Sequence, residues 1–250
     1  MKKIIRKIIM PESTLNAVEG TDVISKRIKN IQSIWHNEHQ DDVGIEKLIR
    51  LFLAASQFIF PGIYLKHWAG KKGIIYEELM VDLYIFLKML LPFFILYYNL
   101  QEYPILLKVN LWLLIETILY LATLVFASDI FSNPRSYRRS MLLMFLDYFQ
   151  IVLCFAVLYS SGNYLNHPLN HWFDAIYFSV ITSATVGYGD FHPVTAHGKF
   201  LVTAQISVFF IVVVLFLNFF TSKLEQKGYF DGSSSQNKKG PSETKGPENF

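Results

Sequence analysis

Cysteine is almost absent from this sequence, because Cys154 is the only one among 250 residues. A single cysteine excludes a disulfide framework within one chain and a metal site built from cysteines. Charge is also sparse: charged residues make up 17% of the chain, whereas hydrophobic residues make up 52% and aromatic residues 16%. This balance is too apolar for an ordinary soluble domain and is typical of a protein that crosses a membrane several times.

Catalytic patterns are missing as well. The sequence contains no nucleophile motif, no glycine-rich phosphate loop and no spacing of zinc ligands, so we expect neither an enzyme nor a bound cofactor. The net charge is only +3, and basic residues are not interleaved with aromatic ones. A nucleic-acid partner is therefore not expected.

Long apolar runs are what the sequence does contain. A membrane-spanning helix needs about 20 mostly apolar residues, and four segments meet or approach this length: 82–99, 104–127, 141–160 and 198–222. A fifth, shorter apolar piece lies at 174–184. The predicted fold class is an all-α membrane protein with four transmembrane helices, plus a re-entrant helix and loop.

The distribution of lysine and arginine predicts the orientation. Residues 161–196 and 100–103 contain neither lysine nor arginine, so both segments are predicted to be external by the positive-inside rule. The basic loop at 128–140 and the basic amino-terminal region then lie in the cytoplasm. We expect a multi-pass protein of the cell membrane with both termini cytoplasmic.

Residues 185–190, Thr-Val-Gly-Tyr-Gly-Asp, stand between two apolar segments. Irregular backbone at membrane depth is tolerated only where it lines water or protein. Glycine adopts positive φ without a Cβ penalty, so Gly187 and Gly189 allow alternating backbone conformations that aim successive carbonyls to one side. Carbonyls from several copies of this loop can replace the water around a cation, and the Thr185 hydroxyl adds an oxygen at the inner end. The loop is a candidate ion filter.

This hexapeptide resembles the filter signature of the potassium channel family, and the resemblance extends over residues 141–224. The resemblance implies a pore helix at 174–184, a K⁺-selective filter in which Thr185, Val186, Gly187 and Tyr188 bind the ion, and a homotetramer of four such chains. It also implies that Tyr177 in the pore helix hydrogen-bonds Asp190 and, with Phe178 and Gly189, supports the filter. K⁺ is then the only metal ion expected, held by the filter.

The predicted inner helix, 198–222, departs from the family pattern. Many relatives have a glycine where this chain has Phe209, and no glycine or proline occurs between Lys199 and Lys227. A bend at that position is therefore not expected. Alignment with the family places Phe210, Val213 and Leu217 toward the cavity, where apolar rings close a pore by dewetting; ordinary helix packing is the competing interpretation.

Two charged residues are predicted to pair inside the membrane. At about 1.5 Å per residue, Lys88 and Asp147 each lie roughly 9 Å from the cytoplasmic ends of their spans. An unpaired charge at this depth is costly. We therefore expect an ion pair that joins the first span to the outer helix of the pore module.

The remaining segments complete the domain organisation. Residues 1–81 are a cytoplasmic region with a helix near 24–35, and they are the place for an unidentified cytoplasmic regulator. Residues 48–65 are predicted to be an interfacial helix or a cytoplasmic packing element rather than a span, because Arg50, Gln57 and the Pro61-Gly62 break interrupt them. Residues 82–127 are two extra spans, 141–222 are the pore module, and 223–250 are a flexible cytoplasmic tail.

The expected function is passive, selective conduction of K⁺, with the protein itself and membrane lipid as partners. Two alternatives remain open at this point. The first is a weakly selective cation channel, which requires the filter to distort. The second is a non-conducting regulatory or scaffold subunit that keeps a channel-like fold.

Overall fold

The computed structural model describes residues 23–37, 44–71, 73–126 and 137–225, and the regular structure in these ranges is helical. Its helices are α2 (Val23–His36), α3 (Ile45–Ser56), α4 (Pro61–Gly70), α5 (Ile74–Tyr97), α6 (Pro104–Phe126), α7 (Tyr137–Ser160), α8 (Trp172–Ser183) and α9 (Ala196–Glu225), with short 3₁₀ turns η2 (Gln57–Ile59) and η3 (Leu100–Glu102). An isolated antiparallel bridge joins Leu165 to Pro193. The all-α fold class is confirmed. The expectations for residues 128–136 of the basic loop, for the basic residues before position 23 and for the tail after 225 fall outside the described residues.

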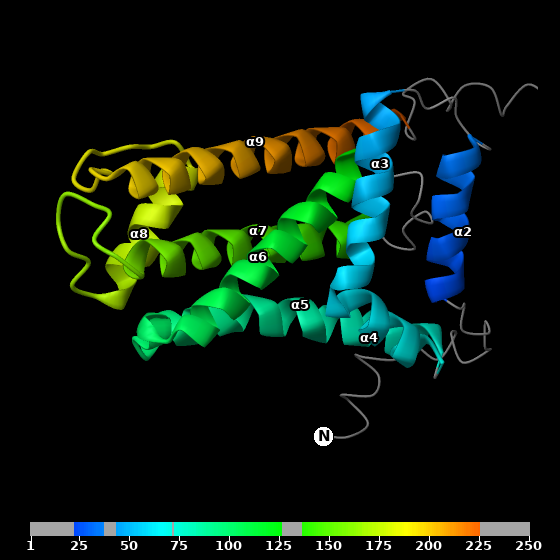
Figure 1. The fold of residues 1–250 in the computed structure, drawn as a ribbon, viewed down its shortest axis with the longest axis horizontal. Helices are drawn as coiled ribbons and strands as arrows, with labels where there is room; N and C mark the ends of the chain where they lie inside the picture. Colours follow the sequence, from blue (N-terminus) through cyan, green and yellow to red (C-terminus); the bar gives the residue numbers. More distant parts are fainter. Residues whose placement is uncertain (1–22, 38–43, 72, 127–136, 226–250) are drawn as a thin grey trace, which may run out of the picture.

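In the described part of the chain, four helices are long and apolar enough to cross a membrane, α5, α6, α7 and α9, and the bent pair α3 and α4 makes a fifth span if it is counted as one. The chain is therefore a membrane protein. Figure 1 shows the four long helices extending along the long axis of the molecule, with α6 inclined to the others. α8 and the loops that flank it lie at one end, and α2 and α3 lie at the other.

The first span begins earlier than predicted. α5 starts at Ile74, so the predicted boundary between residues 81 and 82 falls inside one continuous helix. The prediction stopped at Asp82 because acidic residues precede the apolar run. The structure pairs these acids: Asp82 accepts hydrogen bonds from Arg139 of α7, and Glu77 lies 3.2 Å from the Lys66 ammonium of α4. Paired charges are tolerated at the end of a span, so the helix continues through them.

The segment predicted as interfacial, 48–65, is divided between two helices. α3 and α4 are bent by 68° at the break before Pro61, where the fixed φ of proline suits the first position of a new helix. In Figure 1, α3 runs across the end of the bundle that lies far from α8. Leu53 and Ala54 of α3 are buried, whereas Leu48 and Phe52 expose 68% and 63% of their surface, so one apolar face of this helix is left uncovered by the chain.

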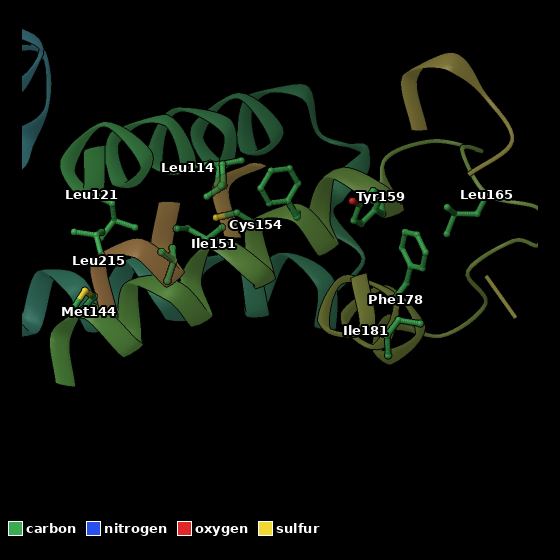
Figure 2. Packing of buried hydrophobic residues seen from close by; sticks show 13 residues of the cluster. Leu114, Leu121, Met144, Ile151, Cys154, Tyr159, Leu165, Phe178, Ile181 and Leu215 are labelled. Atoms are coloured by element: carbon green, nitrogen blue, oxygen red, sulfur yellow. The ribbon is translucent and has the colours of Figure 1, made fainter. Parts of the chain in front are cut away.

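The core is centred on α7. Leu114 and Leu121 of α6, Ile151 and Cys154 of α7, and Leu215 of α9 form one buried cluster, which Figure 2 shows at close range. The same cluster continues toward α8 through Tyr159 and Phe178, whose rings meet edge to face with centroids 4.8 Å apart. The cluster thereby fixes α8 against α7, and α8 positions the loop that follows it.

Candidate functional site

The loop after α8 has the backbone that the sequence predicts for its glycines. Gly187 and Gly189 have φ of 58° and 86°, and Thr185 also has a positive φ, of 53°. Positive φ therefore recurs at every second residue from Thr185 to Gly189. Val186 and Tyr188, between these positions, expose 49% and 71% of their surface in the single chain.

The sequence analysis predicts Thr185 as an ion-binding residue but does not predict its positive φ. A β-branched residue at positive φ is a genuine outlier, and the left-handed conformation costs about 1–2 kcal/mol for a residue with a Cβ. Hydrogen bonds to the end of α8 hold it there: Thr185 N donates to Thr182 O at 3.1 Å, and Val186 N donates to Ile181 O at 2.9 Å. These bonds also satisfy carbonyls that have no partner inside the helix.

The other end of α8 is capped by its own side chains. His171 Nδ1 accepts a hydrogen bond from Phe173 N, and Asp174 Oδ2 accepts one from His171 N at 3.0 Å. This reciprocal capping box satisfies N–H groups of the first turn. α8 is thus fixed in length at both ends, from Trp172 to Ser183.

Tyr177 and Asp190 come together, as the resemblance implies. The phenol donates a hydrogen bond to the carboxylate, which lowers the pKa of Asp190, and the same bond raises the pKa of Tyr177. Phe178 is buried, with only 3% of its surface exposed. The rings of Tyr177 and Phe178 both lie near the Phe191 ring, with centroid distances of 6.3 and 6.4 Å.

Asn166 adds a second brace that sequence reasoning did not find. Its Nδ2 donates to the Asp190 carbonyl at 3.0 Å, and its Oδ1 accepts from His192 N at 2.9 Å. The backbone of Asn166 also donates to His192 O. One amide side chain thus fixes the backbone on both sides of Phe191. No sequence pattern indicates this contact, because Asn166 lies 24 residues before Asp190 in a loop without a motif.

With this geometry described, the chain can be compared with known proteins. Residues 140–226 match the family model described as "Ion channel". The chain is 41% identical over 61 residues to a hyperpolarization-activated voltage-gated potassium channel of Methanocaldococcus jannaschii. The aligned segment covers 24% of this chain and 28% of the relative. The chain is also 51% identical over 45 residues to the potassium channel protein kcv of Paramecium bursaria Chlorella virus 1. This aligned segment covers 18% of this chain and 48% of the relative.

Residues 140–226 are thus similar to an ion-channel domain, and both of these relatives are potassium channels by name. The matches span less than half the length of each curated relative, and no solved structure matched the chain. The channel domain comprises α7, α8, the filter loop and α9, whereas α2 to α6 precede it.

The inner helix of the channel domain, α9, has one face that its own chain leaves open. Phe210 and Leu217 lie on this face, with 60% and 61% of their surface exposed. Val213 is partly buried, and its neighbour Val214 is exposed instead. Of the three predicted cavity residues, two therefore share the open face of the helix. Val214, and not the predicted Val213, lies on the open face with Phe210 and Leu217. The helical period explains this, since residues 210, 214 and 217 follow the 3.6-residue repeat.

The predicted ion pair outside the channel loop is present. Lys88 Nζ of α5 lies 3.7 Å from Asp147 Oδ1 of α7, and it donates a hydrogen bond to Thr117 Oγ1 of α6 at 2.9 Å. Thr117 in turn donates to Gln150 Oε1 at 2.6 Å. The polar cluster joins three spans, whereas the prediction joined only two.

Glu116 also has a partner that the sequence did not reveal. Tyr84 donates to its Oε2 at 2.6 Å, and the backbone at Gly62 of α4 approaches the same carboxyl closely. Glu116 therefore connects α4, α5 and α6 close to the Lys88 cluster.

Proposed function

We propose that the protein is a potassium-selective channel in which four copies of the chain place residues 185–190 around a common axis. The observation that carries the proposal is the alternation of positive φ at Thr185, Gly187 and Gly189. An alternating backbone presents main-chain oxygens as a column, and such oxygens replace the hydration shell of K⁺. Thr185, Val186, Gly187 and Tyr188 supply the ion-binding oxygens in this proposal.

The exposure of the loop supports a ring of several chains. Tyr188 and Val186 have large apolar surfaces without cover in one chain, and closed rotational symmetry is the usual way to cover the same surface on every subunit. The relatives named above are potassium channels by name, and the family resemblance favours four subunits.

The electrostatics of α8 favour a cation. Its carboxyl end stops two residues before Thr185, and a helix carries a partial negative charge at this end. The exposed face of α9 supplies the wall below, with Phe210 and Leu217 as apolar rings at which the path closes by dewetting. Conduction is passive, so no catalytic step or cofactor enters the mechanism.

The orientation follows from the basic residues. Arg139 lies at the end of α7 far from the filter and pairs with Asp82, whereas residues 161–196 contain no lysine or arginine. We therefore place the filter mouth outside and both termini in the cytoplasm of a cell membrane. On this side, residues 23–70 are the surface available to a cytoplasmic regulator.

The test is K⁺ flux into liposomes that contain the purified protein, with Gly187→Ala compared to the parent. Alanine at φ 58° is strained, and a backbone that relaxes from this strain moves the neighbouring carbonyls, so we expect flux to fall at least about tenfold, as for a residue forced into the left-handed region. Gly44→Ala is the matched control, since Gly44 has φ of 66° and open space around its Cβ position but lies before α3.

Three outcomes separate the alternatives. Loss of flux in Gly187→Ala, with an intact tetramer and parental flux in Gly44→Ala, supports the filter. Reversal potentials in mixed K⁺ and Na⁺ near zero would instead favour a weakly selective channel. No flux from the parent under any voltage, pH or lipid composition would favour the scaffold and end the proposal.

A further inference from the structure

Gln205 is a polar residue in the apolar inner helix α9, and only 1% of its surface is exposed. Burial of an amide without hydrogen bonds is costly. Its Oε1 accepts a hydrogen bond from the Tyr159 hydroxyl of α7 at 2.7 Å. Its Nε2 donates to both the carbonyl and the hydroxyl oxygen of Ser179 in α8, each at 2.9 Å. One amide thus joins the outer helix, the pore helix and the inner helix.

The chemistry of the partners fixes the direction of the amide. The Ser179 carbonyl can only accept a hydrogen bond, so it must face the NH₂ group of Gln205. Ser179 uses its own hydroxyl hydrogen to donate to the Val152 carbonyl at 2.6 Å, which leaves the hydroxyl oxygen free to accept. The Tyr159 hydroxyl then donates to the remaining amide oxygen. All three residues are buried, so water does not substitute for a lost partner.

The position of Ser179 links this cluster to the filter. Ser179 lies one turn before the end of α8, and the carbonyls of the next residues hold the filter entrance: Val180 O accepts from Ala184 N and Ile181 O accepts from Val186 N, both at 2.9 Å. A shift of this last turn therefore changes the position of the first filter carbonyls. Gln205 holds the start of this last turn of α8 through its hydrogen bonds to Ser179.

The inner helix is suited to transmit such a shift. No glycine or proline occurs between Lys199 and Lys227, so α9 continues without an intrinsic bending point. Phe209, one turn after Gln205, lines a small cavity together with Tyr148 and Ser183 at the end of α8. A movement of α9 beyond Phe209 is therefore transmitted to α8 through the side-chain amide of Gln205.

We propose that Gln205 is a positioning residue that sets the geometry of the filter from the inner helix, through its hydrogen bonds to Ser179. This inference rests on the proposed potassium-channel function. Loss of the amide frees the last turn of α8, which lowers selectivity for K⁺ over Na⁺ and shortens the time for which the filter conducts.

The test uses full-length protein in planar lipid bilayers, with the K⁺/Na⁺ permeability ratio and the open fraction as readouts. Gln205→Met keeps the length of the side chain and removes its hydrogen bonds. With two bonds to Ser179 lost, we expect the permeability ratio to fall roughly tenfold. Thr123→Ala is the control, because the Thr123 hydroxyl donates to Leu119 O of its own helix, α6, and this helix precedes the channel segment.

Tyr159→Phe provides the second arm. It removes one hydroxyl and leaves the bonds between Gln205 and Ser179, so we expect a fall of about two- to threefold. Because Tyr159 acts through Gln205, the double variant Tyr159→Phe/Gln205→Met should match Gln205→Met alone. If Gln205→Met does not assemble, Tyr159→Phe decides the question.

The outcomes separate the two proposals. A tetrameric Gln205→Met variant with the parental permeability ratio and open fraction would overturn the role of Gln205, while the conducting parent would leave the channel function intact. Failure of the parent itself to conduct K⁺ would overturn the channel function. A Tyr159→Phe variant with parental values, when Gln205→Met cannot be assembled, would also overturn the role of Gln205.

Discussion

At the scale of single residues, the outer mouth of the filter depends on the hydrogen bond from Tyr177 to Asp190. This bond lowers the pKa of Asp190, so it stabilises the ionised carboxylate. A group whose pKa is lowered by folding contributes stability above its ordinary pKa, and the contribution is lost as the pH falls through the lowered pKa. The mouth should therefore lose its brace on external acidification.

Tyr177→Phe removes the phenol and leaves the ring in place. The pKa of Asp190 then rises toward its ordinary value, so we expect the decline of K⁺ current on external acidification to begin at a higher pH than in the parent. The measurement is current against external pH at fixed voltage. Tyr98→Phe, at an exposed tyrosine, should leave the midpoint unchanged. Equal midpoints in Tyr177→Phe and the parent would contradict the argument.

The buried charges of the first span depend on one another in the same way. Lys88 and Asp147 have 6% and 2% of their side-chain surface exposed, and removal of one partner leaves an uncompensated charge. Replacement of either by alanine should destabilise the folded protein by about 3 kcal/mol, measured by thermal unfolding in detergent. Lys108→Ala is the control, since Lys108 is an exposed cation of α6.

The exchanged variant Lys88→Asp/Asp147→Lys tests whether the pair itself matters. The charges remain opposite, and the Thr117 hydroxyl beside position 88 can donate to a carboxylate as well as accept from an ammonium. We expect the exchange to recover most of the lost stability and the assembly of the protein. An exchange as damaging as either alanine variant would show that the individual residues, and not their pairing, are required.

At the scale of elements, the contact between the start of α9 and the loop after α7 requires glycine. A Cβ atom at Gly198 would lie 2.8 Å from the Tyr164 carbonyl oxygen, which belongs to the backbone. Tyr164 O also accepts a hydrogen bond from Val194 N, so it cannot move freely. α9 can approach the outer mouth this closely only without a side chain at residue 198.

Gly198→Ala should therefore destabilise the protein by about 1–3 kcal/mol, as overpacking does. Gly162→Ala is a matched comparison: its Cβ would lie 2.7 Å from the Tyr164 ring, but at the far end of a side chain that can rotate away. We expect a clearly lower melting temperature for Gly198→Ala than for Gly162→Ala, measured in the same detergent. Equal melting temperatures would refute the close approach at Gly198.

At the scale of the whole molecule, the two ends of the bundle have different tasks. The filter loop and its braces lie at the α8 end, and α2 to α4 lie at the other (Figure 1). Between them, Glu116 of α6 accepts a hydrogen bond from Tyr84 of α5 and lies against Gly62 of α4, and the Lys88 cluster joins α5, α6 and α7. The preceding helices are thus attached to the outer helix of the channel domain by polar contacts inside the membrane, where such contacts are costly to leave unmade.

Much of this arrangement could be predicted from the sequence. Apolar length indicated the four spans, because a helix must be long enough to cross the hydrocarbon core. Charge depth alone indicated Lys88 and Asp147 as partners. The start of α5 was placed too late, since the pairing of Asp82 with Arg139 connects residues 57 positions apart and leaves no local pattern.

The sequence by itself indicated the positive φ at Gly187 and Gly189 in the proposed filter loop, because glycine favours this conformation locally and needs no other segment to explain it. Only the tertiary structure decided that Thr185 shares this conformation, that Asn166 holds the outer mouth, and that Gln205 joins the inner helix to Ser179. Asn166 and Gln205 act through hydrogen bonds between segments distant in the chain. The positive φ of Thr185 is a strained conformation that hydrogen bonds to α8 stabilise. Backbone preference is encoded residue by residue, whereas the choice of a hydrogen-bond partner is made when the helices pack.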